Sequence, residues 1–173
     1  MDGVGGPLML FVRSGDDPHP AEPGILTCAG MTMMERAWQA LVNPWEALMQ
    51  IARLDHLVLT VADIAETCNF YTRVLGMEVV TFGEGRTALR FGQQKINLHQ
   101  ADAIPGLVAD RPTMGSGDLC FITETPIAEV VAHLNQCGVP IITGPGPRAG
   151  AIGTITSVYI RDPDQNLVEI SNY

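Results

Sequence analysis

Basic residues are scarce in this sequence of 173 residues, which has 10 Lys and Arg against 19 Asp and Glu and a formal net charge of −9. A chain with so few cations has no basic face to neutralise a phosphate backbone, so we expect no nucleic-acid partner. Binding to an anionic membrane surface is discounted for the same reason. Long apolar runs are also missing, since no stretch approaches the roughly 20 apolar residues that a membrane-spanning helix needs.

Closely spaced cysteines are missing as well. None of the four cysteines forms a Cys-x-x-Cys pair with another: Cys28, Cys68, Cys120 and Cys137. The spacing therefore predicts neither a disulfide framework nor a structural zinc site, and it fits a reducing, cytoplasmic environment. The chain opens Met-Asp-Gly, which is acidic where an export signal needs positive charge, so we expect no signal peptide.

The composition is that of a packed globular protein, with 46% hydrophobic and 17% charged residues. The first 50 residues differ from the rest, because Gly and Pro interrupt most of residues 1–30. Residues 32–50 favour a short helix that begins with Thr32 and Glu35 at capping-box spacing. We therefore divide the chain into a partly disordered N-terminal extension, 1–50, and one domain, 51–173.

An internal repeat organises the domain. Residues 54–80 match residues 117–142 position by position, so that Gly76 corresponds to Gly138. Each copy reads as an apolar strand, a helix that ends at glycine, and a second strand. Asp63 is placed to cap the first helix, and Thr125 to cap the second with Pro126 in its first turn.

Two further short strands follow in each copy. The sequence therefore predicts an α+β fold of two βαβββ modules, 54–101 and 116–173, that form a curved mixed sheet around a metal cleft. The second copy carries about ten extra residues rich in Gly and Pro, 144–153. We interpret this run as a long loop, either functional or plain surface.

Polar residues recur on one side of four predicted strands. Side chains on a strand alternate between faces, so the apolar neighbours pack under the helices while the polar residues face the cleft. The cleft-facing residues of the first module are His56, Asn97 and His99. Those of the second module are Asp118, Cys120 and Glu169. An imidazole with carboxylates and a further His or Asn suits a divalent metal such as Mn, Fe, Ni or Mg.

Three stretches carry a resemblance to a known family: LDHLVLTVADI, FYTRVLGMEVV and RDPDQNLVEISNY. From Leu54 to Tyr173 the sequence resembles the vicinal oxygen chelate superfamily, which includes glyoxalase I, the fosfomycin-resistance enzymes and the extradiol dioxygenases. Within it the chain is most similar to the glyoxalase domain-containing proteins. The resemblance implies a glyoxalase-like fold and a divalent metal ion (Ni, Mn, Fe, Mg or Zn) that acts as a Lewis acid on a small oxygen-rich substrate.

The resemblance also implies residue roles. It assigns the metal to His56, Asp118, Glu169 and either Asn97 or His99, and general-base catalysis to Glu169 or Asp118. Asp118 stands where glyoxalase I has a histidine, and Asn97 stands where it has a glutamate. These departures leave open a small-molecule binding protein of the same fold, and a dioxygenase if His99 reaches the metal.

Two more residues are candidates for substrate binding. Arg148, in the Gly- and Pro-rich run, either closes over the cleft to hold an anionic group or is a solvated cation. Cys120 lines the cleft or, as an alternative, acts as a nucleophile. The resemblance further implies a homodimer. The sequence leaves open whether the two modules share a cleft within one chain or exchange across a dimer.

Overall fold

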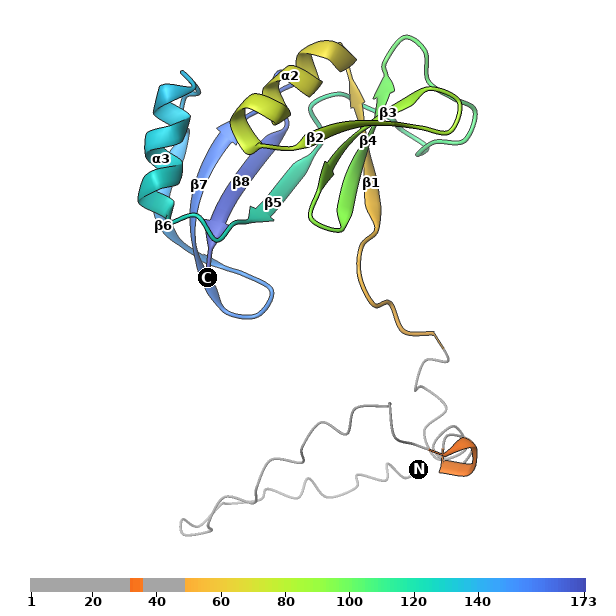
Figure 1. Ribbon diagram of the computed structural model, residues 1–173, viewed down its shortest axis with the longest axis horizontal. Helices are drawn as coiled ribbons and strands as arrows, with labels where there is room; N and C mark the ends of the chain where they lie inside the picture. Colours follow the sequence, from red (N-terminus) through yellow and green to blue (C-terminus); the bar gives the residue numbers. More distant parts are fainter. Residues whose placement is uncertain (1–31, 36–48) are drawn as a thin grey trace, which may run out of the picture. The chain divides into compact units, whose positions relative to one another are not determined.

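The computed structural model describes residues 32–35 and 49–173, and the chain divides into two units, 1–50 and 51–173 (Figure 1). In the first unit Thr32 and Glu35 form a capping box, in which the Thr32 N–H donates to Glu35 Oε2 at 2.7 Å and the Glu35 N–H donates to Thr32 Oγ1 at 3.3 Å. Cys28 and the rest of the predicted helix lie outside the described residues. No helix in the described ranges is long and apolar enough to span a bilayer.

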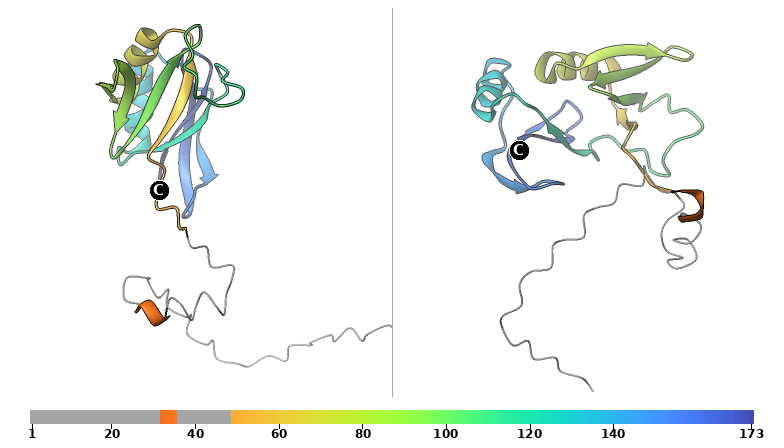
Figure 2. Two further views of the ribbon diagram at one scale, coloured as in Figure 1. Left: turned by 90° about the vertical axis from the view of Figure 1, so that its right-hand side faces the viewer. Right: turned by 60° about the horizontal axis from the view of Figure 1, so that its bottom comes forward.

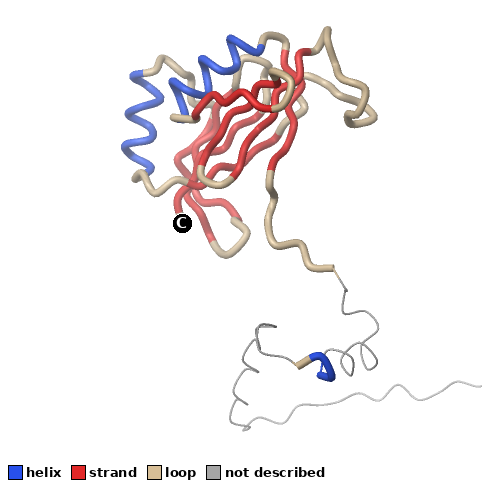
Figure 3. The backbone as a smooth tube through the Cα atoms, turned by 45° about the vertical axis from the view of Figure 1, so that its right-hand side comes forward, coloured by secondary structure: helices blue, strands red, loops and turns tan. Residues whose placement is uncertain are grey.

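The second unit contains two modules with the same order of elements (Figure 3). The first comprises β1 (His56–Val61), α2 (Ile64–Leu75), β2 (Glu78–Phe82), β3 (Arg86–Phe91) and β4 (Gln94–Gln100). The second comprises β5 (Asp118–Ile122), α3 (Ile127–Gln136), β6 (Thr143–Ala149), β7 (Thr154–Arg161) and β8 (Leu167–Asn172).

Each module forms its own four-stranded mixed sheet, in the orders β1-β4-β3-β2 and β5-β8-β7-β6. The first and last strands of each module pair in parallel, and the other pairs are antiparallel. The parallel pair is possible because the helix in each module supplies the crossover that it needs. The predicted α+β fold of two βαβββ modules is confirmed.

The two helices begin differently. At α2 the Asp63 side chain accepts a hydrogen bond from the Glu66 N–H at 2.9 Å, and Gly76, at φ 67°, ends the helix, both as predicted. The prediction that Thr125 caps α3 was wrong. Pro126 itself occupies the N-cap position with φ −53° and ψ 137°, and no side chain caps the helix. Thr125 thus lies one residue too early to reach the first free N–H groups.

The Gly- and Pro-rich run is mostly a strand, so the prediction of a ten-residue loop was wrong. Residues Thr143–Ala149 form β6, which pairs with β7 at the edge of the second sheet. Proline has no backbone N–H, and an edge strand tolerates it where that position faces away from the neighbouring strand and would form no hydrogen bond within the sheet. Gly144 has φ +100°, and a Cβ atom there would lie 2.4 Å from the Ser157 carbonyl oxygen, so only glycine fits.

The apolar faces of both sheets pack against one core. This core combines strand residues of the two sheets with α2 and α3, including Leu59, Tyr71, Ile96, Leu134, Val168 and Ile170. Phe91 of β3 and Phe121 of β5 meet edge to face, with ring centroids 5.2 Å apart, across the boundary between the modules. Since both apolar faces turn toward this core, the opposite face of each sheet turns away from it.

The two helices are neighbours in the ribbon (Figure 2), and side chains near their C-terminal ends connect the modules. His133 of α3 places Nε2 3.0 Å from the Val74 carbonyl oxygen in the last turn of α2. Arg73 of α2 donates from Nη1 to the Cys137 carbonyl oxygen at 2.8 Å, just past α3. Each helix therefore supplies a side chain that satisfies a free carbonyl at the C-terminal end of the other.

Candidate functional site

The polar face of the first module is defined by the register of its strands. His56 lies opposite Lys95, and Thr60 lies opposite His99, in the parallel pair β1 and β4. Asn97 lies two residues from both Lys95 and His99 on β4, so its side chain is on the same face of the sheet as theirs. The neighbours that point the other way, such as Ile96, are in the core. His56, Asn97 and His99 therefore lie on one face, away from α2.

His56 is held by its neighbour in the sequence. Its Nδ1 lies 2.9 Å from Asp55 Oδ1, and Asp55 also pairs with Arg53 at 3.1 Å. The hydrogen bond from His56, with the charge of Arg53 adding to it, lowers the pKa of Asp55. A carboxylate at Nδ1 holds the proton there in a neutral imidazole, which leaves the lone pair on Nε2. Among the described residues, nothing hydrogen-bonds to Nε2.

Asn97 and His99 each bury an atom that has no hydrogen-bond partner. Asn97 is 8% exposed, and its Oδ1, like His99 Nδ1, meets no partner in the described part of the chain. A buried polar atom left without a partner destabilises a fold by about 1–3 kcal/mol. In native structures such atoms are usually completed by an ordered water or an ion, or they serve a function. The two atoms make this face a candidate site.

The polar face of the second module is built around Glu169. In the register of this sheet Glu169 lies opposite both Cys120 and Tyr159, and Ser157 lies opposite Ser171. Ser171 Oγ donates to Glu169 Oε1 at 3.4 Å and lies 2.8 Å from Ser157 Oγ. Burial by itself would raise the pKa of Glu169, but hydrogen bonds from these four side chains outweigh it and hold the pKa below its ordinary value. The carboxylate is therefore ionised at neutral pH.

Two residues of β5, Cys120 and Asp118, share this face with the Glu169 carboxylate of β8. Cys120 Sγ lies 3.6 Å from Ser171 Oγ. Burial raises the pKa of the Cys120 thiol, and the negative charges of Glu169 and Asp118 raise it further. A raised pKa keeps the thiol protonated, which favours a lining role over a nucleophilic one. Asp118, two residues earlier on the same face, is exposed at the start of the strand.

Arg148 lies on the edge strand β6, where the sequence had suggested a loop. Its Nε donates to Tyr159 Oη at 3.2 Å, and its guanidinium lies 5.3 Å from the centre of the Tyr159 ring. Tyr159 was missed as a site residue, although the alternation along 154–161 puts it on the face of Glu169. Burial raises the pKa of Tyr159, and so does its hydrogen bond to Glu169. Tyr159 thereby connects Arg148 to Glu169.

A single chain does not assemble the predicted ligands into one cluster. Across residues 32–35 and 49–173, no three His, Cys, Asp or Glu side chains come close enough to hold a metal ion. The reason lies in the packing, because both modules turn their apolar faces to the shared core. The face of His56, Asn97 and His99 and the face of Asp118 and Glu169 consequently point away from that core, each in its own module.

The sequence matches the model of the Glyoxalase/Bleomycin resistance protein/Dioxygenase superfamily over residues 53–170. The chain belongs to this superfamily. It is 58% identical to virulence protein STM3117 of Salmonella typhimurium over 125 residues, which cover 72% of this chain and 87% of that protein. It is 49% identical to glyoxalase domain-containing protein RDO1 of Mycosarcoma maydis over 136 residues, 76% of this chain and 77% of that protein.

Solved structures of the superfamily agree with the fold. The match to the crystal structure of STM3117 has a TM-score of 0.71 and covers 72% of this chain and 99% of that chain. Integron cassette protein VCH_CASS1 from the mobile metagenome of V. Cholerae, 56% identical, covers 73% and 99% with a TM-score of 0.72. Lactoylglutathione lyase from Agrobacterium tumefaciens, 23% identical with a TM-score of 0.56, covers 72% and 96% and shares the fold.

Proposed function

We propose that this chain is a glyoxalase-like metalloenzyme of the lyase or isomerase type, with its site assembled between two copies of the chain. The observation that carries the proposal is the orientation of His56, whose Nδ1 lies 2.9 Å from Asp55 Oδ1 while Nε2 has no hydrogen-bond partner among the described residues. Imidazole ligands of metals typically have their second nitrogen bound to such a carboxylate. When bound, a divalent metal would act as a Lewis acid on neighbouring oxygens of a small substrate.

The residues on the two polar faces fit such an ion. The first module offers His56 Nε2 and the unpartnered Asn97 Oδ1 or His99 Nδ1. The second module offers the ionised carboxylate of Glu169 and the exposed carboxylate of Asp118. One or two imidazoles with hard oxygen donors suit Ni, Mn, Fe, Mg or Zn.

A homodimer would bring the two faces together. In an isologous pair, the first-module face of one copy meets the second-module face of the other, and symmetry produces two identical sites. The two faces complement each other, because the first has buried atoms without a described partner and the second has an ionised carboxylate, and a metal ion between them would contact both.

Glu169 is the candidate general base because of its position on this face. Tyr159 and Ser171 hold its carboxylate in place, and the lowered pKa keeps it deprotonated at neutral pH. Asp118, on the same face, is the alternative base. Arg148 is held against the ring of Tyr159, whose hydroxyl hydrogen-bonds to the Glu169 carboxylate.

Metal analysis of the full-length protein purified without an affinity tag tests the proposal. We expect bound metal in the wild type and a loss of at least about tenfold in His56→Ala and in Glu169→Gln, because each removes a ligand. Glu129→Gln is the matched control, because it removes the same charge from an exposed position on α3. This variant should keep its metal.

A mixing experiment tests the assembly between copies. When His56→Ala and Glu169→Gln chains are unfolded together and refolded, half of the dimers are mixed, and each mixed dimer has one intact site out of two. About a quarter of the wild-type metal content should return. No recovery, with dimers present, would contradict a site shared between copies, and a monomeric wild type would do so too.

A second candidate is a protein that binds a small molecule without converting it. The observation that favours it is Asn97, a neutral amide at the place that corresponds to the Glu169 carboxylate in the other module. A neutral amide binds divalent ions less strongly than a carboxylate does. Metal-free wild-type protein that still binds a ligand would establish this alternative.

A further inference from the structure

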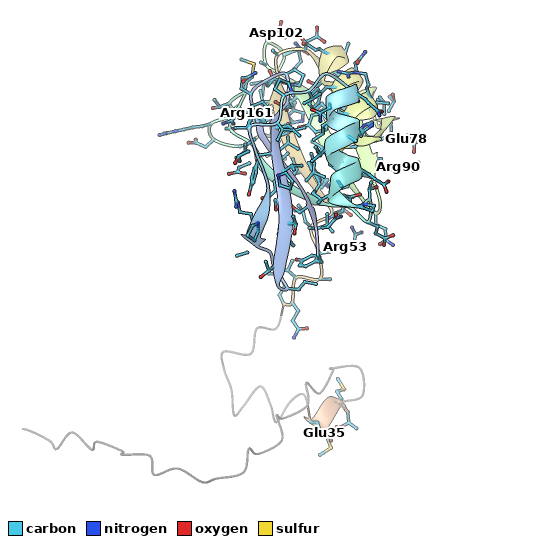
Figure 4. The ribbon with its side chains drawn as sticks, turned by 90° about the vertical axis from the view of Figure 1, so that its left-hand side faces the viewer. Glu35, Arg53, Glu78, Arg90, Asp102 and Arg161 are labelled. Atoms are coloured by element: carbon cyan, nitrogen blue, oxygen red, sulfur yellow. The ribbon has the colours of Figure 1, made fainter. Side chains whose placement is uncertain are left out.

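Two cations share one aromatic ring on the first-module face. Lys95 Nζ lies 3.5 Å from the centre of the Phe82 ring, and the Arg86 guanidinium carbon lies 4.7 Å from it. Neither cation has an ion-pair partner among the described residues. Their neighbour Arg90 is different, because it pairs with Glu78 on the adjacent strand (Figure 4). Lys95 and Arg86 therefore place positive charge on this face that no described carboxylate neutralises.

The ring holds these two cations in position. A cation is attracted to the face of an aromatic ring, and this attraction restrains side chains that would otherwise move freely. Phe82 lies on β2 and Lys95 on β4, with β3 between them in the sheet. Their contact consequently spans the polar face across β3, and it keeps both positive charges beside the Phe82 ring. A bound anion would be attracted to both charges.

The same face contains the unpartnered atom of Asn97. Lys95 lies two residues before Asn97, so strand alternation puts both side chains on one side of the sheet. Asn97 is 8% exposed and its Oδ1 has no described partner. Two cations without a described counter-ion thus lie on the face that also contains this buried amide.

We propose that Lys95 and Arg86, held by Phe82, form a binding site for the oxyanion of a small molecule, such as a carboxylate, a phosphate or a phosphonate. The guanidinium offers paired N–H donors that match two oxygens, and the ammonium adds a point charge. This inference deepens the proposed function, since it names the substrate of that site as an oxyanion. Binding of the anion itself does not depend on the metal.

Titration of the full-length, chelator-treated protein with inorganic phosphate at low chloride tests this site, with calorimetry as the readout. We expect Lys95→Gln and Arg86→Gln each to weaken phosphate binding by at least about tenfold, the loss typical of a charge-assisted contact. Arg90→Gln is the matched control, because it removes the same charge from the same face but from a cation already paired with Glu78. It should change phosphate binding by less than about twofold.

A parallel titration with acetate separates the two sources of the oxyanion. Tighter binding of phosphate indicates a phosphate or phosphonate, and tighter binding of acetate indicates a carboxylate. Circular dichroism and sedimentation of each variant report on folding and on the oligomeric state. Unchanged binding in both folded variants, or no binding of either anion by the wild type, overturns the inference. So does loss of the dimer in Lys95→Gln with anion binding intact, since the cations would then serve contact between chains.

The inference and the proposed function fail separately. His56→Ala should lose metal but still bind phosphate, whereas Lys95→Gln should lose phosphate but keep metal. If the wild type holds no metal while Lys95→Gln still abolishes anion binding, the metalloenzyme proposal fails and the oxyanion site stands. If metal is bound through His56 and Glu169 but phosphate binding does not depend on Lys95, the oxyanion site fails alone.

Discussion

The two modules share one order of elements but differ in the chemistry of their polar faces. The first face has His56, Asn97 and two cations without described partners, and two of its buried atoms lack hydrogen bonds. The second face centres on Glu169, an anionic carboxylate that four side chains stabilise. A duplicated scaffold has therefore produced two unlike halves, one with buried polar atoms and cations that lack described partners and one that presents an anionic carboxylate.

The edge strand β6 differs from its counterpart β2 in its glycines and prolines, and Gly144→Ala should disrupt it. Alanine at φ +100° is strained, and its Cβ would meet the Ser157 carbonyl oxygen at 2.4 Å. We expect a loss of about 3 kcal/mol in the free energy of unfolding, measured by denaturant titration. Gly146→Ala on the same strand is the control, since its nearest atom is Arg148 Nη1 at 3.7 Å. Equal effects of the two changes would contradict this explanation.

Asp55→Asn should sharpen the comparison on the side of the first module. Asp55 holds His56 through Nδ1, whereas hydroxyl groups hold Glu169 in the second module. Loss of the carboxylate should weaken metal binding by about 10-fold to 100-fold, which competition with a chelator can measure. Asp110→Asn, an exposed change of the same charge, is the control and should leave the metal affinity unchanged. A normal affinity in Asp55→Asn would show that His56 does not depend on Asp55.

Tyr159→Phe should give the smallest effect, a shift in pH dependence that belongs to the second module alone. The lowered pKa of Glu169 keeps its carboxylate ionised, and any stabilisation from it is present at neutral pH and lost as pH falls through that pKa. The Tyr159 hydroxyl is one of the groups that lower the pKa of Glu169 against the effect of burial. In Tyr159→Phe the pKa of Glu169 should therefore rise, and the loss of stability should begin at a higher pH. Carbon-13 NMR titration of the carboxyl group measures this pKa directly, with Tyr173→Phe as the control.

The sequence predicted most of the fold because the signals are local. Asp63 and Gly76 bound α2 as expected, since an N-cap and a left-handed glycine act within one turn. The prediction of a loop at the Gly- and Pro-rich run was wrong, because these residues have little strand preference of their own and form a strand only through pairing with β7. Thr125 failed as a cap for a related reason, since Pro126 takes the N-cap position itself.

Alternation also predicted which candidate residues share a face within each module, but it left gaps. Tyr159 was overlooked because an aromatic residue in an apolar strand resembles core. The hydrogen bond of Asp55 to His56 and the contact of Lys95 with Phe82 depend on side-chain positions that no spacing encodes. The role of Arg148 in substrate binding stays a prediction, and its place on β6 against Tyr159 came only with the structure.

The sequence by itself determined the duplication, the order of elements and the face on which His56, Asn97, Asp118 and Glu169 lie, because a strand repeats every two residues wherever it packs. The tertiary structure decided how the faces meet. Each apolar face must be buried, and pairing it within the chain or with another copy would satisfy that need equally well. Only long-range packing put both apolar faces on one core and turned the two polar faces away from it.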